Sequence, residues 1–199
     1  MMSQADNDIK TRILLSARKL FAKQGFEGTT VRQICEDAGA NVALVSYHFG
    51  GKEKVFEAIF QHFFSGNMIS ELEDQLSDPV VGLRTIIEET VNFSCVYDKE
   101  LSFIIQQEMT MNSSRKAIVN KYLNPVWTKV KELLQKGKDQ GIFHFDSLSY
   151  TLLMVMGVAL AHKREYNYDA IIGESDMNPL EIADQTVAFI FKGLGVQMS

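Results

Sequence analysis

The sequence predicts an all-α fold, and three observations lead to this prediction. Only 3 of the 199 residues are proline, so few positions break a helix, while 13 Phe and 9 Met supply bulky apolar side chains for an interior. Apolar residues recur at every third or fourth position along most of the chain, as in helices with one buried face. No segment alternates with the two-residue period of a strand, and no internal repeat is present.

The first predicted helix extends to about Gln24. Asn7 or Asp8 is placed to cap its start, and Gly25 is placed to end it in a left-handed conformation. Its apolar stripe has spacings of four and three and consists of Ile9, Ile13, Ala17 and Leu20.

Two short helices are expected next. Thr30 is followed three positions later by Gln33, the spacing of a capping box, and Gly39 ends the helix that begins there. Asn41 can cap a third helix, which runs to about His48 before two glycines. Two short helices joined by a glycine-containing turn and braced by a longer helix form a helix-turn-helix, whose second helix enters a DNA major groove.

The charge distribution supports a nucleic-acid partner for this N-terminal part alone. The whole chain has a net charge of −5, but residues 9–56 contain 8 basic and 4 acidic residues. From Glu57 onward there are 12 basic and 19 acidic residues. A basic head on an acidic body is expected where one part of the surface meets phosphate, although charge alone is equally compatible with a solvated surface.

Three segments of the head carry a family resemblance: residues 29–34 (TTVRQI), 38–43 (AGANVA) and 47–53 (YHFGGKE). In this order and spacing they resemble the DNA-binding domain of TetR-family transcriptional repressors. The resemblance implies that Arg32 reaches a phosphate or a base edge. It implies that four residues contact the DNA backbone: Thr30, Tyr47, His48 and Lys52. It also implies that four residues face the groove: Asn41, Val42, Ala43 and Ser46.

Local chemistry agrees with these roles. Val42, Ala43 and Ser46 are small enough for a helix to lie deep in a groove about 12 Å wide. Lys52 follows two glycines at the start of the next helix, where backbone amides and an ammonium group can converge on one phosphate. Ser46 departs from the aromatic residue that many family members have before the Tyr47 position, so the operators of better-known relatives do not transfer to this chain.

The remaining chain reads as a larger helical domain. We expect the DNA-binding domain at residues 1–53, a lever helix at about residues 53–75 that links it to the rest, and an effector-binding and dimerisation domain at residues 54–199. Pro79 is placed to open a further helix. Another helix is expected at residues 103–111, and a long one that Pro125 interrupts extends to about Gln140.

The last two long helices are the expected dimer interface. Each has an apolar seam that can pack in a four-helix bundle across a twofold axis, unless both seams are buried within one chain. The TetR resemblance implies a dimer formed through the same two helices. The predicted interface residues are Leu148, Leu152, Val155, Ala159, Ala183, Val187, Ile190 and Leu194.

An apolar effector pocket is expected between the lever helix and these seams, because this region is rich in aromatic residues and methionine. The family resemblance implies an inducer there, although a side chain of this kind taken singly is more often plain core. The candidate ligand-binding residues are Phe93, Tyr97, Phe103, Met109, Trp127 and Met154.

Other classes of protein fit the sequence less well. Four scattered histidines, no nucleophile motif and no phosphate-binding glycine loop argue against an enzyme. Cys35 and Cys95 lack the paired spacing of a metal site, so neither a metal nor a cofactor is expected. The N-terminus has no secretory signal pattern and the longest apolar run is too short to cross a bilayer, which predicts a cytoplasmic protein with no membrane partner.

The sequence therefore predicts a homodimeric DNA-binding repressor, released from a palindromic double-stranded operator when a small molecule binds its body. Two alternatives remain: a DNA-binding regulator without an effector, and a helical protein-interaction module.

Overall fold

A computed structural model describes residues 4–64, 69, 72–173 and 177–196, and within these ranges the chain forms helices and no strand. The predicted all-α class is thereby confirmed. The described residues include no helix long and apolar enough to cross a bilayer. Contacts group the chain into two compact units: unit 1 comprises Met1–Gly66 and Glu100–Tyr122, and unit 2 comprises Asn67–Lys99 and Leu123–Ser199. These units describe packing, and the division by function near residue 53 stays a prediction.

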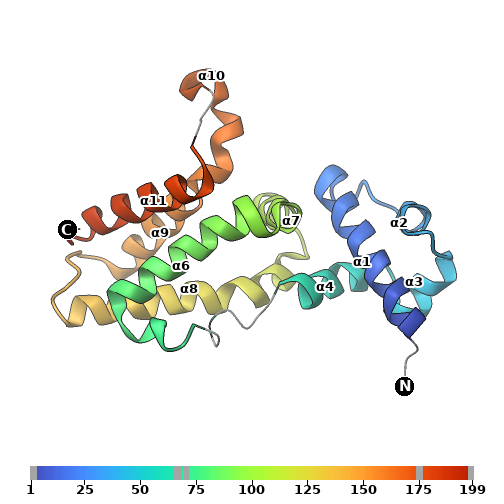
Figure 1. Cartoon of the computed structure of the whole chain (residues 1–199), viewed down its shortest axis with the longest axis horizontal. Coiled ribbons are helices and arrows are strands. Elements are labelled where there is room, and N and C mark those ends of the chain that lie inside the picture. Colours follow the sequence, from blue (N-terminus) through green and yellow to red (C-terminus); the bar gives the residue numbers. More distant parts are fainter. Residues whose placement is uncertain (1–3, 65–68, 70–71, 174–176, 197–199) are drawn as a thin grey trace. The chain divides into compact units, whose positions relative to one another are not determined.

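Unit 1 contains the three N-terminal helices of the predicted head together with later parts of the chain (Figure 1). Its helices are α1 (Gln4–Gln24), α2 (Val31–Ala38), α3 (Val42–Phe49), α4 (Lys52–Phe63), α7 (Lys99–Met111) and the first residues of α8 (Lys116–Asp139). The start expected at Asn7 or Asp8 is wrong, because α1 already begins at Gln4.

A cluster of aromatic rings forms the centre of unit 1. The ring centroids of Phe21 and Phe26 are 5.2 Å apart, and both rings pack against Phe56 at 5.8 and 5.6 Å. Phe60 continues the cluster and stacks on Tyr122 of α8 at 5.5 Å. Residues far apart in sequence therefore close the core of unit 1.

Polar contacts join α7 to α1 within the same unit. Gln107 donates a hydrogen bond from Nε2 to the Ala22 carbonyl at 3.2 Å. Arg18 Nε lies 2.8 Å from Glu100 Oε2. The head is thus a four-helix N-terminal layer with α7 attached to it.

The predicted lever helix is shorter than expected. Helix α4 ends at Phe63, because Phe64 has extended backbone angles, and residues 72–74 form a turn before a short 3₁₀ helix at Gln75–Ser77. Residues 65–68 and 70–71 of the predicted lever lie outside the described residues. The sequence after α4 reads Ser65, Gly66 and Asn67, which are all weak helix formers. The lever prediction followed the apolar period, which continues past the last residue of α4.

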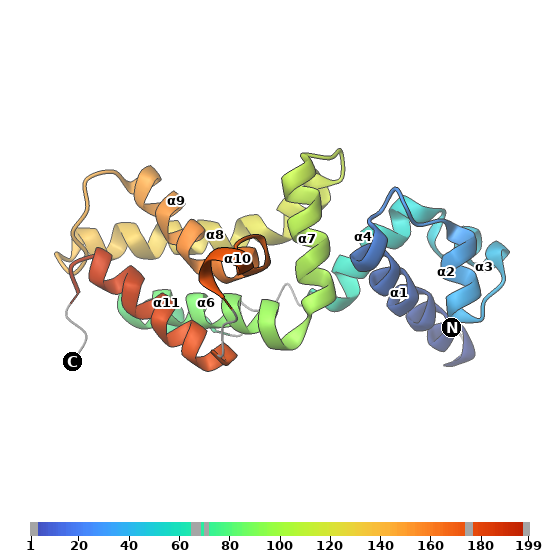
Figure 2. The same ribbon diagram turned by 90° about the horizontal axis from the view of Figure 1, so that it is seen from above.

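Unit 2 is a helical bundle in which α6 (Pro79–Asn92) and α11 (Pro179–Gly193) lie side by side (Figure 2). It also contains most of α8, in which Pro125 sits inside one continuous helix, and α9 (Leu148–Ala159). Three short elements of this unit were not predicted from the sequence: the π-helical turn Phe93–Tyr97, the 3₁₀ helix Ala161–Asn167 and α10 (Asp169–Ile172).

Local capping signals set the starts of α6 and α11. Asp78 Oδ1 accepts hydrogen bonds from the amides of Val80 and Val81, and Pro79 occupies the first turn, where no amide donor is needed. Asn178 forms a capping box with Glu181 at the start of α11. The helix start expected at Pro79 is confirmed.

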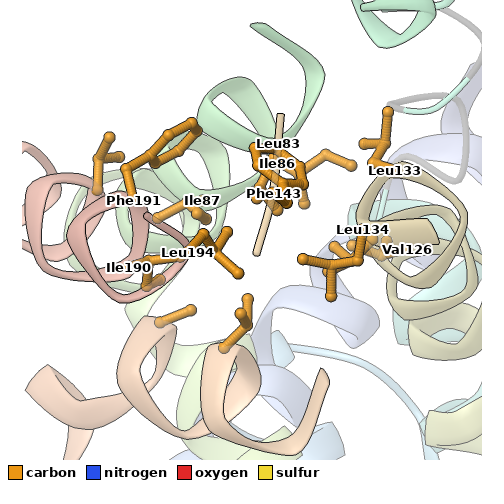
Figure 3. Close-up of a cluster of buried hydrophobic side chains, with 14 of the residues drawn as sticks. Leu83, Ile86, Ile87, Val126, Leu133, Leu134, Phe143, Ile190, Phe191 and Leu194 are labelled. Carbon is orange, nitrogen blue, oxygen red and sulfur yellow. The ribbon is translucent and has the colours of Figure 1, made fainter. Parts of the chain in front are cut away.

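The core of unit 2 is apolar and draws on every long helix of that unit (Figure 3). Phe143, in the loop after α8, is 2% exposed and packs edge-to-face on Phe191 of α11, with ring centroids 6.0 Å apart. The labelled side chains of Figure 3 come from α6, α8, α11 and this loop: Leu83, Ile86, Ile87, Val126, Leu133, Leu134, Phe143, Ile190, Phe191 and Leu194.

Replacement of Gly137 by alanine tests this packing. An added Cβ would lie 2.1 Å from Cδ2 of Phe143, so the ring would have to move within a filled core. We expect Gly137→Ala to lower the free energy of unfolding by about 2 kcal/mol, despite a helix-propensity gain of about 1 kcal/mol. Urea denaturation measures the change. Adding Phe143→Leu should cost less in the Gly137→Ala background than in the wild type, and additive losses would contradict the predicted clash.

Candidate nucleic-acid interface

The start of α2 is fixed by a capping box around Thr30. The Thr30 hydroxyl accepts a hydrogen bond from the Gln33 amide at 3.2 Å, and the Thr30 amide donates to Gln33 Oε1 at 2.8 Å. Ile34 and Cys35 face the core, and burial raises the pKa of the Cys35 thiol. The other side of the helix, with Arg32, points to solvent. The predicted capping box is confirmed.

The turn into α3 depends on one glycine and one asparagine. Gly39 has φ +62°, a left-handed conformation that ends α2 without a Cβ penalty. Asn41 then caps α3, with Oδ1 accepting from the Ala43 amide at 2.9 Å. Because Oδ1 of Asn41 is used in this cap, its amide NH₂ group is the part of the side chain left for the predicted role in the groove.

Helix α2 is braced against α1 at defined points. The buried Ser16 hydroxyl of α1 donates to the Ile34 carbonyl at 3.1 Å. Lys19 Nζ lies 2.8 Å from Asp37 Oδ1, and this hydrogen bond lowers the pKa of the Asp37 carboxyl below its usual value. Helix α3, whose Val45 is fully buried, packs against α2 and α4.

Most of the predicted DNA-contacting residues are exposed on this arrangement. Tyr47 is 82% exposed and Val42 is 47% exposed, so neither ring nor branched side chain belongs to the core. His48 and Lys52 are only partly exposed. The remaining exposed members of the predicted set are Thr30, Arg32, Asn41, Ala43 and Ser46.

Two of these side chains have neighbours within the head. Arg32 Nε lies 2.9 Å from Glu36 Oε1, one turn further along α2, so its guanidinium is paired but still exposed. The rings of Tyr47 and His48 meet edge to face at 4.9 Å, and His48 Nε2 is buried with no hydrogen-bond partner.

Lys52 has a second role that the sequence did not reveal. Its Nζ donates to the carbonyl oxygens of Phe26 and Thr29, each at 2.8 Å, and lies 4.1 Å from the centre of the Phe26 ring. An ammonium group has three donors, so one N–H is left for a phosphate. Lys52 therefore ties the start of α4 to the loop between α1 and α2, and its predicted phosphate contact stays a prediction.

The six candidate effector residues do not gather in one unit. Phe103 and Met109 belong to unit 1, whereas the rest belong to unit 2. Tyr97 and Met154 are 63% and 60% exposed, and Trp127 packs against the core of unit 2. Phe93 opens the π-helical turn, an element often found at functional sites. A groove of about 630 Å³ runs along residues 128–140 of α8 to Leu148 and contains none of these six residues.

A polar cluster lies beside the π-helical turn in unit 2. The Ser94 hydroxyl is hydrogen-bonded to Nε2 of His162. Burial, together with the charge of Lys163, lowers the pKa of His162 to about 4, and burial lowers the pKa of Lys163 to about 8. His162 is therefore a neutral imidazole at pH 7, next to an ammonium group that is poorly solvated.

The predicted dimer seams lie in the wrong place for an interface. Val155, Ala183 and Val187 are at most 4% exposed and belong to the core of unit 2. Buried with them are Ala159, Ile190 and Leu194, while Leu148 and Leu152 pack against this core partly exposed. The alternative in which both seams are buried within one chain is the one observed.

Other apolar residues of the same helices remain on the surface. On α9, Tyr150, Leu153 and Met154 are 71%, 62% and 60% exposed. On α11, Leu180 and Phe189 are 70% and 68% exposed. The sequence did not predict a surface stripe on these helices, and it assigned Met154 to an effector pocket. On α9 the spacing of three and four from Tyr150 was visible: this helix is apolar around most of its circumference and so carries two stripes.

A capped, glycine-terminated helix pair braced on α1 defines a helix-turn-helix protein. Residues 13–59 match the family model described as bacterial regulatory proteins, tetR family. Over these residues the chain is similar to this family of transcriptional regulators.

Two curated relatives extend the likeness beyond the head. The HTH-type transcriptional repressor NicS of Pseudomonas putida is 26% identical over 157 residues, which cover 76% of this chain and 74% of NicS. The probable HTH-type transcriptional regulator YttP of Bacillus subtilis is 29% identical over 66% of this chain and spans 65% of YttP. In YttP the match thus covers less than two thirds of the relative.

Solved structures share the fold over nearly the whole chain. HlyIIR, a hemolysin II transcriptional regulator, has a TM-score of 0.77 and 26% identity, with coverage of 96% of this chain and 99% of HlyIIR. AibR, solved in complex with isovaleryl coenzyme A and operator DNA, has a TM-score of 0.74 and 20% identity over 92% of this chain and 98% of AibR. The AibR likeness establishes the fold alone.

Replacement of Lys52 by methionine tests its structural role. The change removes the ammonium group from two carbonyl oxygens while keeping much of the stem, and should lower the free energy of unfolding by about 1 to 3 kcal/mol. Urea denaturation gives the value. Lys54→Met, which removes an exposed lysine paired with Glu57 at 2.8 Å, is the matched control and should change stability by less than about 0.5 kcal/mol. Equal losses in both variants would contradict the role of Lys52.

Proposed function

We propose that this protein is a homodimeric repressor that binds a palindromic operator through α3 and is released by a small-molecule effector. The observation that carries the proposal is the construction of α3. Its buried side is anchored by Val45 and its two ends are fixed by Asn41 and Gly50, while short side chains are exposed between them. A helix built in this way can lie deep in a major groove.

The proposed contacts divide by chemistry. Arg32 and the third donor of Lys52 meet phosphate oxygens, together with the exposed hydroxyls of Thr30 and Tyr47 and the ring of His48. Val42, Ala43 and Ser46 face base edges, and Ser46 is the member able to donate a hydrogen bond to a base. Asn41 joins this set through its amide NH₂ group, because Oδ1 caps the helix.

The proposed dimer uses the outer faces of α9 and α11. These helices pack against each other, and within the described residues their large apolar side chains Leu153, Met154 and Phe189 stay exposed. A second copy related by a twofold axis supplies it, since the same patch then covers itself. The dimer places two copies of α3 about 34 Å apart or slightly further, in successive major grooves.

The proposed effector binds the larger helical domain and favours a spacing of the two heads that does not fit DNA. AibR, which has the same fold, was solved with both an acyl coenzyme A and operator DNA. A coupling of about 1 to 3 kcal/mol would change operator affinity roughly 5- to 150-fold. A regulator that lacks an effector is the alternative, and it would bind DNA with the same affinity at every ligand concentration.

Selection from random duplexes tests the DNA-binding proposal. We expect purified protein to enrich a palindrome, with binding that weakens as salt rises. Arg32→Ala should reduce the slope of log affinity against log salt by about 1 on every sequence, whereas Ser46→Ala should change the enriched sequence. Lys129→Ala in unit 2 is the charge-matched control and should change neither. Absence of any enriched sequence would contradict the proposal.

Substitution on the outer face of α9 tests the proposed dimer. Leu153→Glu places a charge in the centre of the apolar patch, where a copy of itself faces it, and should shift the protein to a monomer in sedimentation experiments. Val81→Glu on α6, where Val81 is 47% exposed, is the matched control and should leave the dimer intact. A monomeric wild type, or a Leu153→Glu dimer as tight as the wild type, would exclude this interface.

A further inference from the structure

Arg115, just before α8 in unit 1, is an arginine with almost no contact with water. Its side chain is 9% exposed, although charged side chains are rarely buried unless they are paired. It lies at the corner between α7 and α8, and in the sequence it is far from the residues that are predicted to contact DNA. A charged group in such a position needs a reason beyond solubility.

Three partners surround its guanidinium group. Nη1 donates to Glu27 Oε1 at 3.0 Å, and the central carbon lies 3.8 Å from the centre of the Phe26 ring. Nε lies 3.2 Å from Oε2 of the buried Glu108, an ion pair without the alignment of a hydrogen bond. The Ser113 hydroxyl also donates to this carboxylate. Through Arg115, the corner of α7 and α8 thus contacts Glu27 and Phe26 in the loop between α1 and α2.

The Phe26 ring connects Arg115 to Lys52. The Lys52 ammonium lies 4.1 Å from the centre of the same ring and donates to the carbonyls of Phe26 and Thr29. Thr29 immediately precedes Thr30, the capping residue of α2. One aromatic ring therefore links the α7–α8 corner to the start of α4 and to the start of α2.

Stability alone does not account for this arrangement. Both charges of the Arg115–Glu108 pair are desolvated, and apolar side chains of similar size commonly replace such a pair at no net loss. An arginine differs from an apolar residue in the directionality of its contacts: its flat guanidinium stacks on a ring while its donors hold a carboxylate on another segment. The residue thus sets the position of the Phe26 loop more than it strengthens the fold.

We propose that Arg115 is a positioning residue for DNA binding: through Phe26 it holds Lys52 and the start of α2 in the arrangement that meets the DNA backbone. This inference rests on the proposed DNA-binding function. It makes the α7–α8 corner a part of the DNA-binding apparatus that touches no DNA. A change at Glu108, Ser113 or Arg115 then alters DNA affinity from a distance.

The first experiment compares Arg115→Lys with the wild type on the duplex enriched by selection. The variant keeps the charge, so electrostatic attraction to DNA is unchanged, but lysine provides a point charge without a flat fork. We expect about tenfold weaker binding and a lower salt slope, as for a lost phosphate contact. Arg84→Lys in unit 2 is the matched control, since Arg84 lies 3.5 Å from Glu88 and 5.8 Å from the Phe191 ring centre. It should leave affinity unchanged.

A double-mutant cycle with Lys52 separates positioning from general stability. If Arg115 acts through Lys52, Arg115→Lys weakens binding in the wild type and adds little in the Lys52→Met background. Additive losses, an unchanged salt slope, or wild-type affinity in Arg115→Lys would each overturn the inference while leaving DNA binding intact. Failure of the wild type to bind any duplex would instead overturn the proposed function, and the inference with it.

A second variant keeps the test valid if Arg115→Lys folds poorly. Glu108→Gln with Arg115→Met removes both buried charges at similar volume, so folding should be preserved as judged by urea denaturation. This double variant retains no cation on the Phe26 ring from the α7–α8 corner. We expect it to be stable yet to bind the enriched duplex about tenfold more weakly, and wild-type affinity together with a wild-type salt slope would overturn the inference.

Discussion

The hydrogen bonds from Lys52 to the carbonyls of Phe26 and Thr29 are the constraint on which the head depends. They close the loop between α1 and α2 by giving a donor to the Thr29 carbonyl and a second donor to the Phe26 carbonyl, which also accepts from the Thr29 amide. They also set where α4 begins relative to α2. The aromatic cluster of Phe21, Phe26 and Phe56 packs beneath them, so burial of the rings and satisfaction of the backbone reinforce each other.

In unit 2, every long helix contributes side chains from its inner face to one apolar core. Helices α9 and α11 contribute Val155 and Val187 to that core, yet both also carry large apolar side chains that are exposed. Exposed apolar patches of this kind are typical of surfaces that bind another protein.

The sequence predicted best what depends on residues close together in the chain. Thr30 with Gln33, Gly39, Asn41 and Pro79 each act within four positions, so helix starts and the helix-turn-helix could be predicted. Lys52 bonds to a carbonyl 26 positions away and Arg115 to a carboxylate 88 positions away, and no local pattern encodes these contacts. On α9, periodicity marks two apolar stripes and cannot tell which one is inside.

The discontinuity of unit 1 has a consequence for biosynthesis. A ribosome delivers the four N-terminal helices first, but the residues that complete their packing, Glu100–Tyr122, emerge after a further 33 residues of unit 2. Until then, Phe60 lacks Tyr122 and the Phe26 loop lacks Arg115. The packing of the nascent head is therefore complete only when more than half of the chain has been made, and a nascent chain that stops at residue 66 carries all three helices of the motif without the contacts that Arg115 and Tyr122 add.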